Sequence, residues 1–586
     1  MDRKSRLVLT ALLLTQVSSH AQTAAVDAGQ LLEQQRRLEQ QAQPAPRLNK
    51  PLRDASVASQ HGKAGDTQVS VRRFKLSGHT LLDDATLQAV LRAWLMRPLT
   101  LFELRQAAVA VEQAYRDAGW LAHASLPAQD LTDGQLRIDI TEARLGQVRM
   151  APATSGSAAE LSPRLTSRVQ AMLDAQLGAG QPLNLLALER ALLIADELPG
   201  AVVGGSLQGG AQPGTTDLLV QVAPAPRLQG DISIDNAANR STGSERVNGS
   251  LRLNAPWGLG ERFDVAASLT RGTDYLRAGA SLPVGLAGWR VGVNASTLRY
   301  RVLESQNITT GLAPEGTTQT VGAEAQYPLI RSPRARWTLS LGAEERHQTN
   351  RDDNVTVGLL EVSSHARSRS ASIGINGWGF DEIGLGGQTL AGVQLVSGRL
   401  SLDGSPNALL AADARAENTQ GDYQVLRWSL SRLQSLSPTL DLWASASGQF
   451  GSRNLNSGEK LYLGGMGAVN AYPSAEAAGS SGQLVNIELR QRLDAAWQIA
   501  GFYDWGQVRQ YRNNARADGA GPLSARNTVT LEGIGASISW RGENGWRAKV
   551  TWAHRIGANP LMTTTGRDTD GSFDLNRIWL SAGYSF

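Results

Sequence analysis

From residue 228 to the C-terminus, the chain repeats a pattern in which apolar and polar residues alternate one by one. In the segment GWRAKVTWAHR, for example, Val550 and Trp552 alternate with Lys549 and Thr551. A period of two places successive side chains on opposite faces of a β-strand. No helical period is seen in this part of the chain, so we predict that it consists of β-strands separated by turns.

Two fold classes have such strands: a soluble sandwich, which buries its apolar faces, and a membrane barrel, which turns them outward to lipid. The number of strands favours the barrel, because a closed bacterial barrel needs an even number. We count sixteen segments. They are 228–239, 244–254, 261–271, 274–284, 288–302, 315–329, 334–349, 365–380, 387–402, 418–434, 439–452, 482–494, 497–511, 526–541, 545–557 and 574–586.

The connections between these segments also favour the barrel. Short turns alternate with connections that are often longer, as in barrels with short turns on one side of the membrane. Tryptophans gather at the short-turn ends, which an aromatic girdle at one membrane interface explains. The short turns are 256–260, 331–334, 436–439, 494–496 and 543–545, and the tryptophans are Trp257, Trp289, Trp337, Trp378, Trp443, Trp497, Trp540 and Trp546.

The last segment, RIWLSAGYSF, carries an apolar face that ends in Tyr584 and Phe586. An unpaired strand edge in lipid would leave backbone groups without hydrogen bonds, so the barrel must close on this strand. A final strand ending in Phe resembles the terminal signal of outer-membrane proteins. Tyr584 and Phe586 are therefore our candidates for that signal, and the barrel-assembly machinery is an expected partner during biogenesis.

The N-terminus has the pattern of a secretory signal peptide over residues 1–21. Basic residues precede an apolar stretch from Leu7 to Val17, and small residues at Ser19 and Ala21 suit a cleavage site before Gln22. A lone membrane anchor is the alternative, but this apolar stretch is too short to span a bilayer. The chain has 0 cysteines, which excludes disulfides and thiolate metal sites.

A polar helix is predicted next, within residues 22–42. The segment VDAGQLLEQQRRLEQQA contains strong helix formers, with Asp27 as its cap. Leu31, Leu32 and Leu38 form only a narrow apolar stripe, so this helix needs water or a polar cavity around it. Residues 43–68 are rich in proline and small residues, which is typical of a linker.

Two modules with the predicted order β-α-α-β-β follow, over residues 69–144 and 145–226. In the first, VSVRRFKLSG precedes two amphipathic helices, and the strands LAHASLP and LRIDITEA close the module. The second module repeats this order, ending in AVVGGSLQ and TDLLVQVAP. Two tandem copies of this arrangement resemble the POTRA domain, a small periplasmic docking module.

Together, the signal peptide, helix, linker, two POTRA-like modules and the barrel at 227–586 resemble the TpsB transporters of two-partner secretion. Within that group the chain is most similar to the hemolysin-activator and filamentous-hemagglutinin transporter proteins. The segment ISIDNAANRSTG resembles the first barrel strand of the family, and LYLGGMGAVNAYPSAEAAGSSG resembles the long sixth loop that folds into the lumen. FYDWG, at residues 502–506, matches the family's pattern on strand thirteen.

The resemblance implies a site inside the lumen. In the family, an arginine at the tip of the sixth loop pairs with the strand-thirteen aspartate; here the tip carries Asn470, which can offer Asp504 hydrogen bonds but no opposite charge. The alternative for Asp504 is a solvated lumen charge. The loop candidates are Gly464, Gly465, Val469, Asn470, Ala471, Tyr472 and Pro473, and the strand candidates are Phe502, Asp504 and Gly506.

The resemblance implies export of a partner exoprotein, such as an adhesin, hemolysin or contact toxin, from POTRA domains in the periplasm through a barrel in the outer-membrane lipid. The alternatives are an assembly factor of the same superfamily, which typically has more POTRA domains and no such helix, and a passive porin. The seven histidines are scattered, and no nucleophile elbow or phosphate loop occurs. We therefore expect no enzyme, metal or other cofactor, and no nucleotide or nucleic-acid partner.

Overall fold

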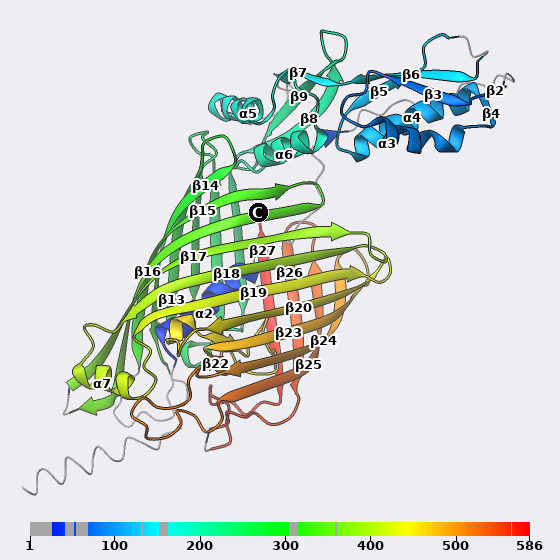
Figure 1. Ribbon diagram of the computed structural model, residues 1–586. Helices are drawn as coiled ribbons and strands as arrows, with labels where there is room; N and C mark the ends of the chain where they lie inside the picture. The colour runs from blue at the N-terminus through cyan, green and yellow to red at the C-terminus, as the bar shows by residue number, and fades with distance from the viewer. Residues whose placement is uncertain are drawn as a thin grey trace, which may run out of the picture.

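The computed structural model describes residues 26–41, 52–53, 68–129, 133–151, 162–303, 314–357, 360–563 and 565–586. The predicted signal peptide lies outside the described residues, as does most of the predicted linker. Three parts are visible in Figure 1: a large barrel, two small α+β modules at one end of it, and a helix inside the barrel.

The barrel is closed and consists of sixteen antiparallel strands, which confirms the predicted number. In order around the barrel they are β10 (Leu228–Asp235), β11 (Arg246–Asn254), β12 (Arg262–Leu269), β13 (Thr273–Val284), β14 (Trp289–Arg301), β15 (Glu315–Arg331), β16 (Ala335–Val357), β17 (Leu360–Asp381), β18 (Gly387–Ser401), β19 (Gly421–Ser435), β20 (Leu440–Gly451), β23 (Ser481–Arg492), β24 (Trp497–Arg509), β25 (Thr528–Arg541), β26 (Trp546–Arg555) and β27 (Asn576–Ser585).

The apolar face of each strand points outward, and the polar face lines the lumen. On β26, Val550 and Trp552 are exposed on the outside. The neighbouring Thr551 and Arg555 are buried on the inside. A soluble protein would bury such an apolar face, whereas a membrane barrel exposes it to lipid. Among the described residues, no helix is long and apolar enough to cross a membrane.

The two ends of the barrel differ in their connections. At the end facing the modules, all turns are short; at the other end, most connections are long. We call these the short-turn end and the long-loop end. Two connections at the long-loop end are short, because β12 and β13 are joined by 270–272 only, and β16 and β17 form one extended hairpin.

The eight tryptophans lie near the short-turn end, as predicted, but two do not fit the girdle explanation. Trp443 lies directly opposite Glu488 and beneath the guanidinium of Arg490, on the lumen side. Trp378 likewise lies beneath the guanidinium of Arg336 inside the barrel. Both occupy the polar face of their strands, so their partners are cations of the lumen wall and not lipid.

The barrel closes between its first and last strands. β10 pairs with β27 from Asp231–Ser585 to Asp235–Ser581. At the short-turn end, Gly230 and Phe586 exchange backbone hydrogen bonds, and at the other end the Asn236 side chain bonds the Leu580 N–H and the Ile578 carbonyl. The Asn236 N–H also donates to the Leu580 carbonyl, so backbone and side chain together continue the ladder beyond the paired strands.

Both modules follow the predicted β-α-α-β-β order, with an additional pair of short strands in the first, and each has a buried core of its own. The first contains β2 (Gln68–Ser70), β3 (Arg73–Ser77), α3 (Asp84–Leu91), η1 (Arg92–Trp94), β4 (Pro98–Thr100), α4 (Leu101–Asp117), β5 (Ala122–Ser125) and β6 (Gln135–Glu142). The second contains β7 (Arg144–Met150), α5 (Pro163–Gln176), α6 (Leu185–Asp196), β8 (Ala201–Gly209) and β9 (Thr215–Pro224).

The second module docks on the short-turn end of the barrel (Figure 1). The Arg168 guanidinium on α5 donates to the carbonyls of Pro283 and Gly285, each at 2.9 Å. Glu197, after α6, forms ion pairs with Arg331 and Arg336 at 2.7 and 3.2 Å. The sheet of this module has the order β1-β8-β9-β7, in which β1 (Leu52–Arg53) comes from the linker and pairs in parallel with β8.

Candidate functional site in the barrel lumen

The helix α2 (Ala28–Gln41) occupies the lumen, where it lies against β14, β15 and β16. Asp27 caps it, accepting from the Gln30 N–H at 2.8 Å, so the predicted cap is confirmed. Leu31 and Leu32 pack against an apolar patch of the wall formed by Tyr275, Leu298, Tyr300 and Val302. This helix is too polar for a protein core, and the polar lumen provides the surroundings it needs.

The remaining contacts of α2 are polar. Arg36 forms an ion pair with Glu344 of β16 at 2.7 Å. Arg37 donates to the Tyr462 carbonyl at 2.8 Å, and Tyr462 belongs to the long connection between β20 and β23. We call this connection, residues 452–480, the sixth loop, because it joins the eleventh and twelfth barrel strands.

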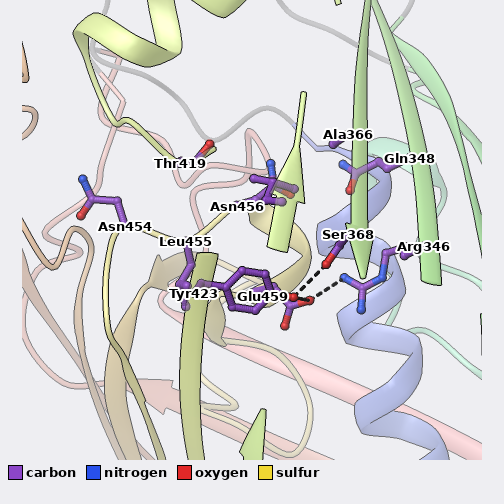
Figure 2. A pocket seen from close by; sticks show the side chains of 11 residues that line it. Arg346, Gln348, Ala366, Ser368, Thr419, Tyr423, Asn454, Leu455, Asn456 and Glu459 are labelled. Atoms are coloured by element: carbon purple, nitrogen blue, oxygen red, sulfur yellow. Dashed lines mark hydrogen bonds and ion pairs between the residues drawn. The ribbon is translucent and has the colours of Figure 1, made fainter. Parts of the chain in front are cut away.

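The sixth loop reaches α2 through η3 (Ser457–Glu459). A small buried network holds η3 to the wall: Glu459 pairs with Arg346 at 3.2 Å and accepts from the Tyr423 hydroxyl at 3.1 Å. The Tyr423 hydroxyl also contacts the Ser368 hydroxyl, as Figure 2 shows. The helix therefore rests partly on the barrel wall and partly on the sixth loop.

The tip of the sixth loop lies on Asp504 of β24. The backbone N–H of Asn470 donates to the Asp504 carboxylate at 3.0 Å, and its side-chain amide donates at 2.7 Å. The Asn486 amide of β23 donates to the other carboxylate oxygen at 2.8 Å. Asp504 is 1% exposed, so it is no longer in contact with bulk water. A buried carboxylate needs such donors, because its desolvation is otherwise costly.

Small residues bring the loop this close to the wall. A Cβ on Gly533 would lie 2.6 Å from the Cβ of Ala471, and a Cβ on Gly506 would lie 2.9 Å from the Leu463 side chain. Gly464 and Gly465 adopt φ values of 87° and 91°, which L-residues rarely adopt. Phe502 packs at the margin of the buried cluster that contains Val469, Ala471 and Tyr472. Pro473 follows this cluster and is itself buried.

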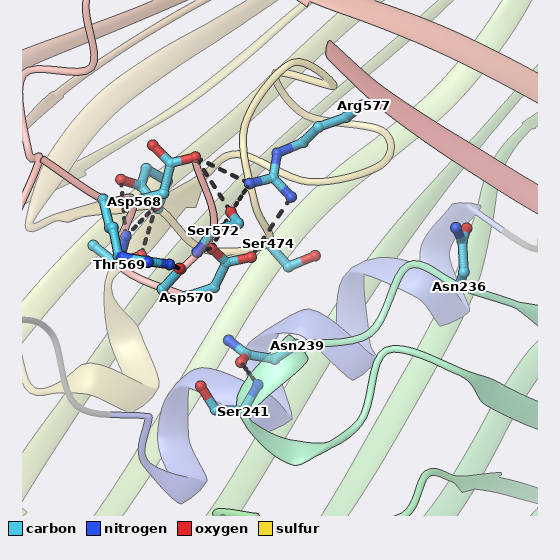
Figure 3. A network of polar contacts seen from close by, with 12 residues as sticks. Asn236, Asn239, Ser241, Ser474, Asp568, Thr569, Asp570, Ser572 and Arg577 are labelled. Carbon is cyan, nitrogen blue, oxygen red and sulfur yellow. Dashed lines mark hydrogen bonds and ion pairs between the residues drawn. The ribbon is translucent and has the colours of Figure 1, made fainter. Parts of the chain in front are cut away.

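The segment of the sixth loop that follows the tip is attached to the connection between β26 and β27. The Arg555 guanidinium lies 4.5 Å from the Tyr472 ring centroid and pairs with Asp568 at 2.5 Å. Arg577 pairs with the same carboxylate at 3.0 Å. Figure 3 shows Asp568 and Arg577 converging there, with Ser572 between them.

Glu476 completes this second attachment. Its carboxylate accepts from the Thr569 hydroxyl at 2.6 Å and from the Asn559 amide, which also donates to Asp568. Burial raises the pKa of Glu476 to about 7, although hydrogen bonds from Thr569 and Asn559 act in the opposite direction. The carboxylates of Glu476 and Asp568 thus share the Asn559 amide as a donor in one buried network. The loop is held both at its tip and in the segment that follows the tip.

The structure brings together the loop and strand residues named from the sequence, and it adds others that sequence reasoning missed. Asn486 could have been found, because it lies directly opposite Asp504 on the lumen face of the neighbouring strand. The Trp579 indole, which donates to the Asn470 carbonyl at 2.8 Å, is also on a lumen face. Asp568 and Asn559 lie in an irregular connection, where no period predicts which residues meet.

Comparison with known proteins identifies the family to which the chain belongs. The profile of the family described as haemolysin secretion/activation protein ShlB/FhaC/HecB matches residues 214–533, and that of the POTRA domain, ShlB-type, matches 69–143. The chain belongs to the ShlB/FhaC/HecB family. Its members are outer-membrane transporters of two-partner secretion, with POTRA domains in the periplasm. The short-turn end of the barrel is therefore periplasmic, and the long-loop end faces outward from the cell.

Relatives and solved structures agree with this assignment. The chain is 24% identical over 541 residues to the heme/hemopexin transporter protein HuxB of Haemophilus influenzae (strain 86-028NP), covering 90% of each chain. It is 25% identical over 455 residues to the outer membrane transporter CdiB of Escherichia coli O6:K15:H31, covering 75% of this chain and 71% of the relative. The structure of CdiB from Escherichia coli matches with a TM-score of 0.62 at 21% identity, covering 95% and 97%.

A further solved structure shares the fold. BamA from Haemophilus ducreyi lacking POTRA domains 1–3 matches with a TM-score of 0.52 at 13% identity, covering 89% of this chain and 100% of that one. This likeness concerns the fold alone. The family match favours a transporter over an assembly factor.

Proposed function

We propose that this transporter exports a single partner exoprotein, an adhesin, hemolysin or contact toxin, in extended form through its lumen, and that α2 is the plug that must leave first. One observation carries the proposal: a polar helix, connected by a linker to the POTRA domains, fills the lumen of a closed barrel. An α-helix with side chains is about 10 Å wide. Removal of α2 would therefore leave a path wide enough for an extended chain.

The contacts of α2 suit a plug that leaves. Arg36 and Glu344 are both partly exposed in the lumen, so water can replace their ion pair at little cost. The apolar contact is small: Leu31 and Leu32 are the buried leucines of the helix. Each contributes about 1.5–3 kcal/mol by burial, which holds the plug at rest without making its release prohibitive.

The POTRA domains would bind the partner in the periplasm. Met96, Leu101 and Phe102, close together in the first domain's sequence, are 78%, 53% and 50% exposed. Exposed apolar side chains of this kind suit an unfolded partner, and edge strands such as β5 suit an added strand. In the second domain, the free edge of β8 is covered by β1 of the linker. A partner strand that displaced β1 would pull on the linker to α2.

In this proposal the barrel carries out no reaction. The described residues contain no cluster of three or more histidine or acidic side chains that could hold a metal ion. Folding or capture of the partner outside the cell would drive export. The C-terminal strand with Tyr584 and Phe586 would be recognised by the barrel-assembly machinery when the transporter itself is inserted.

A reversible crosslink tests the plug. Because the chain has 0 cysteines, Arg36→Cys and Glu344→Cys can be introduced together and bridged by a short reducible bis-thiosulfonate reagent. These side chains already meet across the interface between α2 and β16. We expect the bridge to abolish secretion of the partner and to hold single-channel conductance at its low resting value. A reducing agent should restore both.

Each single cysteine variant, treated with the same reagent, controls for modification of the lumen and should secrete normally. Deleting residues 22–45 should give larger and steadier conductance in planar bilayers. Normal secretion by the bridged variant would show that α2 stays in place during export, and the plug proposal would be wrong.

A further inference from the structure

The outward face of the barrel changes from apolar to charged at one level near the long-loop end. On β17, Ile375 and Ile373 are exposed on the outside, and the next outward positions after Ala371 are Arg369 and Arg367. On β18, Val393 and Leu395 are followed outward by Ser397 and Arg399.

This change coincides with the outer edge of the membrane. Arg369 lies eight residues along β17 from Gly377, which pairs with Trp337 near the short-turn end. With about 3.3 Å per residue and a strand tilt of about 40°, eight residues rise roughly 20 Å. The apolar band of such barrels is about 25 Å tall, so Arg369 and Arg399 lie just inside its outer edge, from which their long side chains reach the lipid headgroups of the outer leaflet.

Two of these arginines are direct neighbours. Arg369 of β17 lies opposite Arg399 of β18 in the register of the sheet. Like charges directly opposite one another destabilise a strand pair. Arg367 adds a third cation two residues along β17. The side chains of Arg369, Arg399 and Arg367 are 63%, 72% and 45% exposed, respectively, so they are accessible from the outside.

Carboxylates flank the three arginines but do not neutralise them. Glu345 of β16 is shared by Arg367, Arg369 and His347. Asp422 of β19 binds Arg399 through two hydrogen bonds, at 2.6 and 2.9 Å. Three arginines therefore face two acids, so the group as a whole keeps an excess of positive charge.

We propose that Arg369 and Arg399, with Arg367 beside them, bind a phosphate group of lipid A, the phosphorylated glycolipid that forms the outer leaflet of bacterial outer membranes. Arginine is suited to this ligand, because its planar guanidinium donates two parallel hydrogen bonds to a phosphate. The phosphate would relieve the repulsion between the neighbouring arginines. The acyl chains would lie on the apolar residues below, among them Ile373 and Leu395.

Native mass spectrometry of the full chain in detergent tests the site. The probes are diphosphorylated lipid A, its dephosphorylated form, and phosphatidylglycerol. We expect the double variant Arg369→Gln/Arg399→Gln to retain diphosphorylated lipid A about ten-fold less than the parent, the factor expected when a charge-assisted contact is lost. Glu345→Gln should retain more, because it removes a competing anion. The parent should retain little dephosphorylated lipid A.

Arg432→Gln is the matched control. Arg432 also lies on the outward face, near the short-turn end, and pairs with Asp381 at 2.7 Å. It should leave lipid A retention unchanged, and heat-dependent gel mobility should confirm that all variants are folded. Undiminished retention by the double variant, or equal loss in the control, would overturn the proposal. So would equally tight binding of phosphatidylglycerol through the same arginines, because the site would then be a general anion surface.

Discussion

At the scale of single residues, the carboxylate of Asp504 accepts hydrogen bonds from three donors and is flanked by no cation of the loop tip. The donors are the backbone and side-chain N–H groups of Asn470 and the amide of Asn486. A hydrogen bond to a charged group contributes about 1.5–3 kcal/mol. Three such bonds can hold the loop tip without the arginine that the family usually places there.

Asp504→Asn should loosen the loop while keeping the size of the side chain. An amide has one acceptor oxygen, so its NH2 group would face donors, and we expect a loss of about 2–3 kcal/mol in loop docking. Elastase, which cuts after small side chains, should then cut after Ala471 faster, and secretion should fall sharply. Glu488→Gln is the control, since Glu488 is a lumen carboxylate that pairs with Arg490 at 2.7 Å. Unchanged cleavage and secretion would reduce Asp504 to an ordinary lumen charge.

Asn470→Arg should be tolerated or should increase secretion. The arginine would restore the ion pair that the resemblance to the family implies at this position, and Asp504 is already oriented toward residue 470. The measurement is the amount of partner released into the medium. A block of secretion would mean that the loop tip depends on the two hydrogen bonds of Asn470, and that the family's contact does not carry over to this chain.

At the scale of elements, the alternation of each strand determines which side chains meet lipid. Val550 of β26 lies between Ile538 of β25 and Leu580 of β27, all on the outward face. Lys549 lies between Ser539 and Ser581 on the lumen face. Because the side-chain period is two, a slip of one residue would exchange these faces along the whole strand.

Val550→Arg should destabilise the inserted barrel by about 2–4 kcal/mol. Val550 is four residues from Trp546, a rise of roughly 10 Å, which places it near the middle of the apolar band. Lys549→Ala should have almost no effect, because the lumen is wet. Equilibrium unfolding in urea, with the barrel refolded into lipid vesicles, measures both. The opposite ranking would show that the register of β26 is shifted by one residue.

At the scale of the whole molecule, stability depends on closure between β10 and β27. The Phe586 ring lies over Gly230, where a Cβ would collide with it. The ring also stacks with Tyr584, at 6.1 Å between centroids, and Tyr584 contacts Trp546 at 4.9 Å. A glycine in a strand that is covered by an aromatic ring is a known means of joining strands at a barrel seam.

Gly230→Val should therefore weaken the seam, by about 1–3 kcal/mol through overpacking. Gly249→Val is the matched control: it lies on the outward face of β11 and a Cβ there would have nothing within 4 Å. The melting temperature of the refolded barrel, followed by heat-dependent gel mobility, should drop for the first variant only. A second change, Phe586→Ala, should recover part of the loss. Equal melting temperatures for both glycine variants would contradict the role assigned to the ring.

Much of the barrel and part of the site could be predicted from the sequence. The strand number, the β-α-α-β-β order and the lumen-side position of Asp504 all follow from the period of apolar residues, a local property. The same period could have corrected the interpretation of Trp378, which alternates with the lipid-facing Ile373 and Ile375. The attachment of Glu476 to Asn559 and Thr569 could not be predicted, because it joins two irregular segments far apart in the chain.

The sequence by itself determined the fold class, because alternation dictates strands, and strands with apolar outer faces in lipid must close. Only the tertiary structure decided what the closed lumen contains. Three features depend on register and on the path of long loops: the contact between α2 and η3, the Arg369–Arg399 pair and the seam over Gly230. Those are set by packing among distant residues, and many sequences with the same alternation would arrange them differently.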